Sequence, residues 1–408
     1  MRAPRLLAVT VALVLVAALG ACSDDEDTSS TGSTEPVATT LPPGGDFYEI
    51  PDPLPAGPPG TIIRSEPITG APDGAQAWLV LYTSTDVSGE PIATSGVIVA
   101  PADPPAPPAG RPVVAWGHPT TGVAQQCAPS IGTPFAFIEG LTDLLAAGFV
   151  VAAPDYSGLG AAGPPSYLIG DLEGRNLLDA ARAARNLPET GAGDEVVLWG
   201  HSQGGHAALF AGQLAPDYAP DLQVLGVAVA APATLLADLV RDDEQTGPGV
   251  SLSIYAMVAY EQAYQSEFPG LDGDDVLTPA AQEAVPQLEQ LCDLTQSEQV
   301  EAIADPLAGN VFAEDPTTTA PWSELLARNT TGAVPILAPV FIAQGDQDTI
   351  VEPSVTEDYA AELCEQGSTV QLTVYPGQTH ETIALVAAPD VVAWAQGLLA
   401  GEDAPSTC

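Results

Sequence analysis

The feature that most constrains this chain is the stretch Val196–His206, which reads VVLWGHSQGGH. It begins as an apolar run typical of a buried strand and leads into a helix-like segment, Ala207–Ala211. Between the two lies Gly-His-Ser-Gln-Gly, a match to the G-x-S-x-G pattern that presents a serine on a sharp strand-to-helix turn. Glycine is needed there because side chains would collide where strand and helix come so close. We therefore predict that Ser202 is a nucleophile rather than part of a structural turn.

Short apolar segments alternate with helical patterns along much of the chain. Strands are expected at Ile62–Ile63, Ala77–Tyr82, Gly96–Ala100, Val113–Trp116, Phe149–Ala153, Val224–Ala230, Pro339–Ala343 and Val370–Tyr375. Helices are expected near residues 135–147, 172–187, 355–366 and 383–399. This alternation predicts an α/β fold with a mostly parallel central sheet covered on both faces. Functional loops of such sheets lie at the carboxyl ends of the strands, which puts Ser202 and the loop Gly117–Gly122 on one edge.

Between residues 233 and 332 the sequence no longer shows apolar segments typical of strands. Helical patches follow one another there, at residues 252–264, 279–292 and 322–328, and the first is rich in apolar and aromatic side chains. We predict that this region is a helical cap inserted into one α/β domain, which spans residues 61–408. An insertion of this size beside an active edge usually serves function.

A nucleophilic serine needs a histidine base, and the base needs a carboxylate that orients it. With the G-x-S-x-G turn these groups follow in the order serine, acid, histidine. Of the four histidines only His380 satisfies that order, and His118, His201 and His206 are expected to shape their loops or pack near the turn. The acid is expected in the loop after the penultimate strand, where Asp348 is favoured by spacing and Asp346 is the alternative.

The oxyanion that forms on attack requires N–H donors already in place. One donor is expected to be the backbone N–H of Gln203, which immediately follows the nucleophile. The other is expected from Thr120 or Thr121 in the loop after an earlier strand, and the Thr121 hydroxyl is a further candidate donor.

The N-terminus has the pattern of an exported lipoprotein. Residues 1–21 combine Arg2 and Arg5 with a short apolar stretch, as in a signal peptide, and Leu-Gly-Ala before Cys22 resembles a bacterial lipobox. Acylation of Cys22 would attach the protein to a membrane surface outside the cytoplasm, whereas ordinary cleavage nearby would release it. Residues 22–60 are rich in Ser, Thr, Pro, Gly and acidic residues, which predicts a disordered tether.

The charge and the cysteines exclude two classes of partner. The formal net charge is −44 and the nine basic residues are all arginine, so the chain has no basic stripe for nucleic acid. No Cys or His pair has the spacing of a metal site, and no metal is expected.

Besides Cys22, four cysteines remain, an even number that in an exported chain predicts two disulfides. They are Cys127, Cys292, Cys364 and Cys408, and the residues alone allow three pairings.

Several ordered motifs together resemble the secretory lipase family. They are Gly-His-Pro-Thr-Thr-Gly at 117–122, Gln-Cys-Ala-Pro-Ser at 126–130, the turn around Ser202, Asp-Thr-Ile-Val at 348–351 and Thr379-His380. The resemblance implies an α/β-hydrolase core, a helical cap, and lipase or esterase activity without cofactor. It implies Ser202, Asp348 and His380 as the triad, Thr121 and Gln203 at the oxyanion, and disulfides Cys127–Cys292 and Cys364–Cys408.

The motifs and the resemblance together predict an extracytoplasmic serine hydrolase. Its substrates are expected to be hydrophobic carboxylic esters, because the predicted cap is apolar and aromatic. Two alternatives keep the same residues: an acyltransferase that uses the same acyl-enzyme, and a non-catalytic lipoprotein that binds a lipid or peptide.

Overall fold

The computed structural model describes residues 45–408. The expected signal peptide, the lipidation site Cys22 and the tether up to residue 44 lie outside the described residues. The remainder of the expected tether, residues 45–60, differs from the prediction because it packs against the domain. It begins with a short 3₁₀ helix, Gly45–Tyr48, in which Phe47 and Tyr48 are buried. The Tyr48 hydroxyl lies 2.8 Å from the Ser130 hydroxyl. The polar composition of the predicted tether does not indicate this contact.

One nine-stranded sheet runs through the described residues, in the order β1-β2-β3-β5-β4-β6-β7-β8-β9. Its strands are β1 Ile62–Ile68, β2 Ala75–Thr85, β3 Pro91–Pro101, β4 Arg111–Gly117, β5 Val150–Pro154, β6 Ala192–His201, β7 Gln223–Ala230, β8 Val340–Gly345 and β9 Val370–Tyr375. The first three strands pair antiparallel, and all pairs from β5 to β9 are parallel. The central strands are buried on both faces, as expected for parallel strands covered by helices. The predicted α/β class is confirmed.

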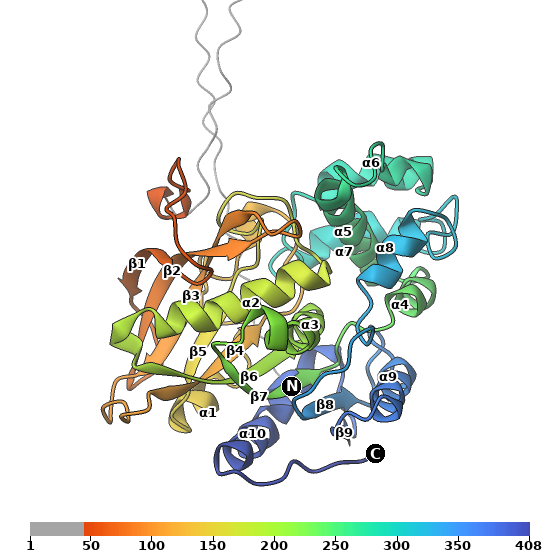
Figure 1. The fold of residues 1–408 in the computed structure, drawn as a ribbon. Coiled ribbons are helices and arrows are strands. Elements are labelled where there is room, and N and C mark those ends of the chain that lie inside the picture. The colour runs from red at the N-terminus through yellow and green to blue at the C-terminus, as the bar shows by residue number, and fades with distance from the viewer. Residues whose placement is uncertain (1–44) are drawn as a thin grey trace, which may run out of the picture. The chain divides into compact units, whose positions relative to one another are not determined.

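Helices cover both faces of the sheet (Figure 1). They are α1 Leu141–Ala146, α2 Gly170–Arg185, α3 Gln203–Tyr218, α9 Pro353–Glu365 and α10 His380–Leu399. Side chains of α2, α3 and α9 share one apolar cluster with the sheet, and those of α1 and α10 share another. Helix α1 is shorter than the expected 135–147 because Gly140, at φ 81°, is left-handed, a conformation that ends a helical path.

Helix α10 is long and apolar enough to cross a membrane by length and composition alone. In the structure its residues Ile383, Ala387 and Val391 are buried in the core cluster beside the sheet. One face of α10 is therefore part of the domain core, whereas Leu385 and Val386 on the same helix are exposed.

Five further helices follow β7 and precede β8, and they form the cap. They are α4 Leu236–Asp243, α5 Gly247–Tyr264, α6 Pro279–Leu288, α7 Ser297–Ala304 and α8 Trp322–Arg328. Helices α4 and α7 are absent from the sequence prediction because each is a short segment of mixed polarity. The cap side chains belong to the same apolar cluster as α10 and one face of the sheet, so the cap and the core share one hydrophobic interior.

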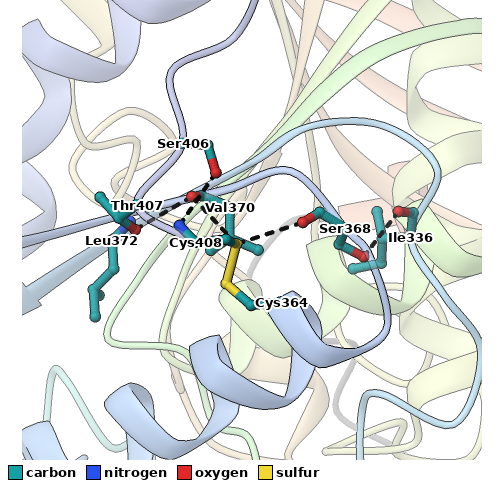
Figure 2. The surroundings of a disulfide bond; sticks show 8 residues. All are labelled: Ile336, Cys364, Ser368, Val370, Leu372, Ser406, Thr407 and Cys408. Atoms are coloured by element: carbon teal, nitrogen blue, oxygen red, sulfur yellow. Dashed lines mark hydrogen bonds between the residues drawn. A yellow bond between two sulfur atoms is a disulfide. The ribbon is translucent and has the colours of Figure 1, made fainter.

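Two disulfides crosslink the domain, Cys127–Cys292 and Cys364–Cys408. These are the pairs that the family resemblance implies. The first joins the loop after β4 to the cap. The second holds the C-terminal segment along the outer strand β9, as Figure 2 shows. There the Thr407 N–H donates to the Val370 carbonyl at 2.7 Å, and the Thr407 hydroxyl accepts from Leu372 N–H at 3.0 Å. An edge strand presents unpaired backbone groups that favour association, and this segment covers part of that edge.

Candidate active site

Ser202 stands at the turn between β6 and α3 in a conformation that side chains rarely adopt, with φ 56° and ψ −118°. The packing around it explains the glycines. A Cβ at Gly200 would lie 2.0 Å from the Gly204 carbonyl oxygen, and one at Gly204 would lie 1.9 Å from that of Gly117. Backbone atoms cannot yield at those distances, so the motif glycines are a steric requirement. The turn is held by hydrogen bonds of Ser202 N–H to Ala230 and of the Ala233 N–H to Ser202.

His380 and Asp348 come together across the ends of neighbouring elements. The Nδ1 of His380, the first residue of α10, lies 2.9 Å from Oδ2 of Asp348 in the loop after β8. The other carboxylate oxygen accepts the backbone N–H groups of Ile350 and Val351, both at 2.9 Å. Burial raises the pKa of Asp348, but its hydrogen bonds with His380 and these N–H groups outweigh burial and leave the pKa below its usual value. Asp348 is therefore an ionised acceptor beside the imidazole.

Asp346, the alternative acid, occupies a different place. It is exposed, and its carboxylate accepts the Gly377 backbone N–H at 2.6 Å. This contact ties the loop after β8 to the loop after β9. The geometry makes Asp346 a turn residue and leaves Asp348 as the carboxylate beside His380.

The loop after β4 lies against the serine turn because β4 and β6 are neighbouring parallel strands, with Gly117 paired to Gly200. The Thr120 hydroxyl is engaged, since it donates to the Tyr167 hydroxyl at 3.2 Å. The Thr121 hydroxyl is buried and has no hydrogen-bond partner within residues 45–408. Gln203 begins α3, so its N–H is among those that have no partner inside the helix. Free donors at these two positions suit an oxyanion site.

A pocket opens onto Ser202 from beneath the cap. It lies between the core and helices α4, α5 and α8, where the empty space amounts to about 540 Å³ with open solvent included. Besides Ser202 its wall includes Leu236, Leu239, Leu252, Ala256, Tyr260 and Leu326. Ile350 and Val351, whose N–H groups hold Asp348, also line it. Ser202 and the Asp348 loop therefore border the same apolar cavity.

A buried polar network lies directly behind the turn, and sequence reasoning did not foresee it. Glu173 of α2 accepts the Gln203 side-chain amide at 2.6 Å and contacts Nδ1 of His206 at 3.2 Å. The other ring nitrogen of His206 donates to the Asn329 carbonyl, at 2.7 Å, just after cap helix α8. Burial raises the pKa of Glu173. The network joins the serine turn to the cap, and no sequence signal marks it because its members come from three distant segments.

The other two histidines lie close to the site. His118 is buried, with Nδ1 2.7 Å from the Pro119 carbonyl, and burial lowers its pKa to about 4, so it is neutral and shapes its loop. The His201 ring packs against the His380 ring, with centroids 4.9 Å apart. No group of three or more His, Cys, Asp or Glu side chains suited to a metal occurs among the described residues.

Comparisons with known proteins agree with this architecture. Residues 136–407 match the family model described as secretory lipase. The chain is 27% identical to a Mycobacterium tuberculosis protein named a probable inactive lipase, over 90% of this chain and 84% of that protein. It is 25% identical to a secreted triacylglycerol lipase of Malassezia globosa, over 89% of this chain and 80% of the relative.

Solved structures give the same fold. Candida antarctica lipase A superposes with a TM-score of 0.75 at 21% identity, over 91% of this chain and 89% of that chain. A rice cell wall degrading esterase from Xanthomonas oryzae gives a TM-score of 0.70 at 21% identity, over 86% of this chain and all of its own. The fold is thus that of α/β-hydrolase lipases and esterases, and the family match covers more than half of the sequence. The chain belongs to the secretory lipase family.

Proposed function

We propose that this protein is an extracytoplasmic serine carboxylic-ester hydrolase whose triad is Ser202, His380 and Asp348. The observation that carries the proposal is the arrangement at one sheet edge. A serine on a strained turn opens into an apolar pocket, and a histidine bonded to a buried carboxylate lies beside that turn. A protein that only binds a ligand has no need of this combination. The same residues argue for turnover here, although one relative carries the name of an inactive lipase.

In the proposed reaction the Ser202 hydroxyl attacks the ester carbonyl and its proton passes to Nε2 of His380. Asp348 keeps the Nδ1 proton in place and stabilises the imidazolium. The Gln203 N–H and Thr121 take the negative charge that develops on the carbonyl oxygen. His380 then protonates the departing alcohol, and an acyl group remains on Ser202. Water, deprotonated by His380, attacks the acyl-enzyme and releases the acid and the free serine.

The pocket favours an apolar acyl group. Its wall between α4, α5 and α8 consists mostly of Leu, Val, Ala and Tyr side chains, with Ser253 as a polar member, and burying a chain there removes apolar surface from water. Hydrophobic esters are therefore the proposed substrates, in keeping with the lipase and esterase names of relatives. We place the protein outside the cytoplasm, since two disulfides are typical of oxidising compartments, and propose Cys22 as its lipid anchor.

A fluorophosphonate probe tests this function most directly. We expect one covalent adduct, which maps to Ser202, and hydrolysis of p-nitrophenyl esters. In Ser202→Ala the rate of this hydrolysis should fall by about 10³-fold or more. Free acid released in water indicates hydrolysis, whereas product that appears only with an added alcohol indicates acyl transfer. A folded sample with neither adduct nor turnover, even in detergent, would favour the non-catalytic lipid-binding alternative.

Ala256 of α5 offers a test of the acyl site. It lines the pocket and is nearly buried, so a larger side chain must occupy the space that an acyl chain would fill. We expect Ala256→Phe to lower kcat/KM for octanoate and longer p-nitrophenyl esters by about 10-fold or more and to leave acetate and butyrate within about two-fold. A uniform loss over the whole series would place the acyl chain elsewhere. Ala263→Phe, on the same helix but outside the pocket lining, is the control.

A further inference from the structure

Beside the proposed triad lies a second histidine–carboxylate contact. Nδ1 of His201 is 3.2 Å from a carboxylate oxygen of Glu139, in the turn before α1. On its other side the His201 ring packs on the ring of His380 at 4.9 Å, with 41° between the planes. Together with the His380–Asp348 bond, the contacts form a chain of four groups: carboxylate, imidazole, imidazole, carboxylate.

The turn that carries Glu139 is fixed to both elements that bear the rings. The Glu139 backbone carbonyl accepts the indole N–H of Trp199 at 3.2 Å. Trp199 and His201 are two residues apart on β6, so their side chains lie on the same face. The next residue of the turn, Gly140, abuts α10, since a Cβ there would lie 2.6 Å from Cβ of Ala388. The turn thus contacts both β6 and α10, the two elements that bear the rings.

His201 and Glu139 have few competing partners. Both ring nitrogens of His201 and the contacting oxygen of Glu139 are buried and make no hydrogen bond of ordinary geometry within the described part of the chain. Burial lowers the pKa of His201, but the carboxylates of Glu139 and Asp348, with the backbone of His380, raise it above its ordinary value. The groups that act on the two rings are Glu139 from the turn, Asp348 from the loop after β8, and Glu381 beside His380 on α10.

We propose that Glu139 and His201 are positioning residues that orient the His380 ring during turnover. This inference rests on the proposed function of His380 as the base. The Glu139 carboxylate holds the His201 ring through Nδ1, and the His201 ring packs on the ring of His380. Neither residue lines the pocket, so the effect should fall on kcat and leave KM unchanged.

The decisive measurement follows the four histidine rings by NMR over pH, which needs no turnover. In Glu139→Gln we expect the titration midpoint of the His201 ring to fall, because a carboxylate that raises it is lost. At fixed pH the ring signals of His380 should also move, because the ring that packs on it is no longer held. Glu139→Asp, which retains the charge, should restore most of both effects. Asp143→Asn removes an exposed charge from the neighbouring helix and should leave both readouts close to those of the wild type.

A second variant covers the case in which Glu139→Gln does not fold. His201→Gln removes the ring that packs on His380, so the His380 ring signals at fixed pH should move and kcat should fall. Unchanged His380 ring signals in whichever of these variants folds overturn the inference, whatever happens to thermal stability.

Kinetics of the same variants separate this inference from the proposed function. If the wild type hydrolyses esters, Glu139→Gln should lower kcat by about 3- to 10-fold with KM unchanged, and Glu139→Asp should restore most of the loss. A wild type with no turnover and no Ser202 adduct would refute the proposed function alone, since the NMR signals still report whether the two rings are coupled. A kcat equal to that of the wild type in an active Glu139→Gln enzyme would refute the inference alone.

Discussion

Replacing Asp348 by asparagine should lower kcat by about 10⁴-fold with little change in KM. An asparagine amide fits the same space, but it supplies an N–H group or a neutral oxygen where Oδ2 accepts from Nδ1 of His380 at 2.9 Å. The imidazole then loses its fixed tautomer and the negative charge that stabilises the imidazolium. Steady-state kinetics with a p-nitrophenyl ester measure the effect, and circular dichroism checks the fold.

Asp346→Asn is the matched control, because the chemical change is the same two residues away. Asp346 is exposed and accepts only from its own loop and the Gly377 N–H, so kcat should stay within about two-fold of the wild type. If the two variants exchanged these results, Asp346 would be the acid and the geometry at His380 would have been misjudged. If both variants lowered kcat only slightly and by the same factor, neither aspartate would act as the acid of the proposed triad.

Replacing Cys127 and Cys292 together by serine should both destabilise the protein and reduce its activity. The two residues are 165 apart in sequence, and loss of such a crosslink costs about 5 kcal/mol in the free energy of unfolding on the chain-entropy account. The same crosslink holds the loop that carries Thr121 against the cap. The Asp293 N–H donates to the Thr121 carbonyl at 2.9 Å, and a Cβ at Gly122 would lie 3.1 Å from Sγ of Cys127. We expect kcat to fall by about 10-fold, since a loosened loop would misplace Thr121, the proposed oxyanion donor.

The second disulfide supplies the control. Cys364 and Cys408 are 44 residues apart, and their replacement by serine should cost about 4 kcal/mol in the free energy of unfolding. This bond lies at β9 and the C-terminus, so kcat of the folded fraction should remain unchanged. Denaturant unfolding and kinetics on both double variants make the comparison. Similar activity in the two would show that the loop after β4 needs no covalent tie to the cap.

The sequence was most informative where a backbone rule is strict. The turn around Ser202 requires glycine at fixed places, and the structure explains both positions by contacts of about 2 Å with backbone atoms. The chain order of serine, acid and histidine then restricted the base to His380, and the spacing favoured Asp348 over Asp346. The structure places Asp348 and His380 in contact and leaves Asp346 in a turn. The buried parallel strands could also be predicted, because a strand covered on both faces is a continuous run of apolar residues.

Shorter and less regular elements escaped prediction. Helices α4 and α7 are eight residues each and have mixed composition, so their stability comes from packing in the cap rather than from pattern. The expected helix at residues 135–147 was too long for a related reason. Its first part forms turns whose carbonyls accept the indole N–H groups of Trp116 and Trp199, and only the tertiary structure provides those donors.

The residues of this sequence determined the turn that carries Ser202, the sheet and the order of the candidate triad, since each depends on local steric rules or on periodic burial. The pocket, the contact of Glu139 with His201 and the network of Glu173, His206 and Asn329 were decided by the tertiary structure. Glu173 and His206 are 33 residues apart, His206 and Asn329 are 123 apart, and no shared sequence pattern links them. The role of a buried polar side chain there depends on the partner that tertiary packing brings within hydrogen-bond distance. Burial makes an unpaired polar group costly, so each such group requires a specific partner.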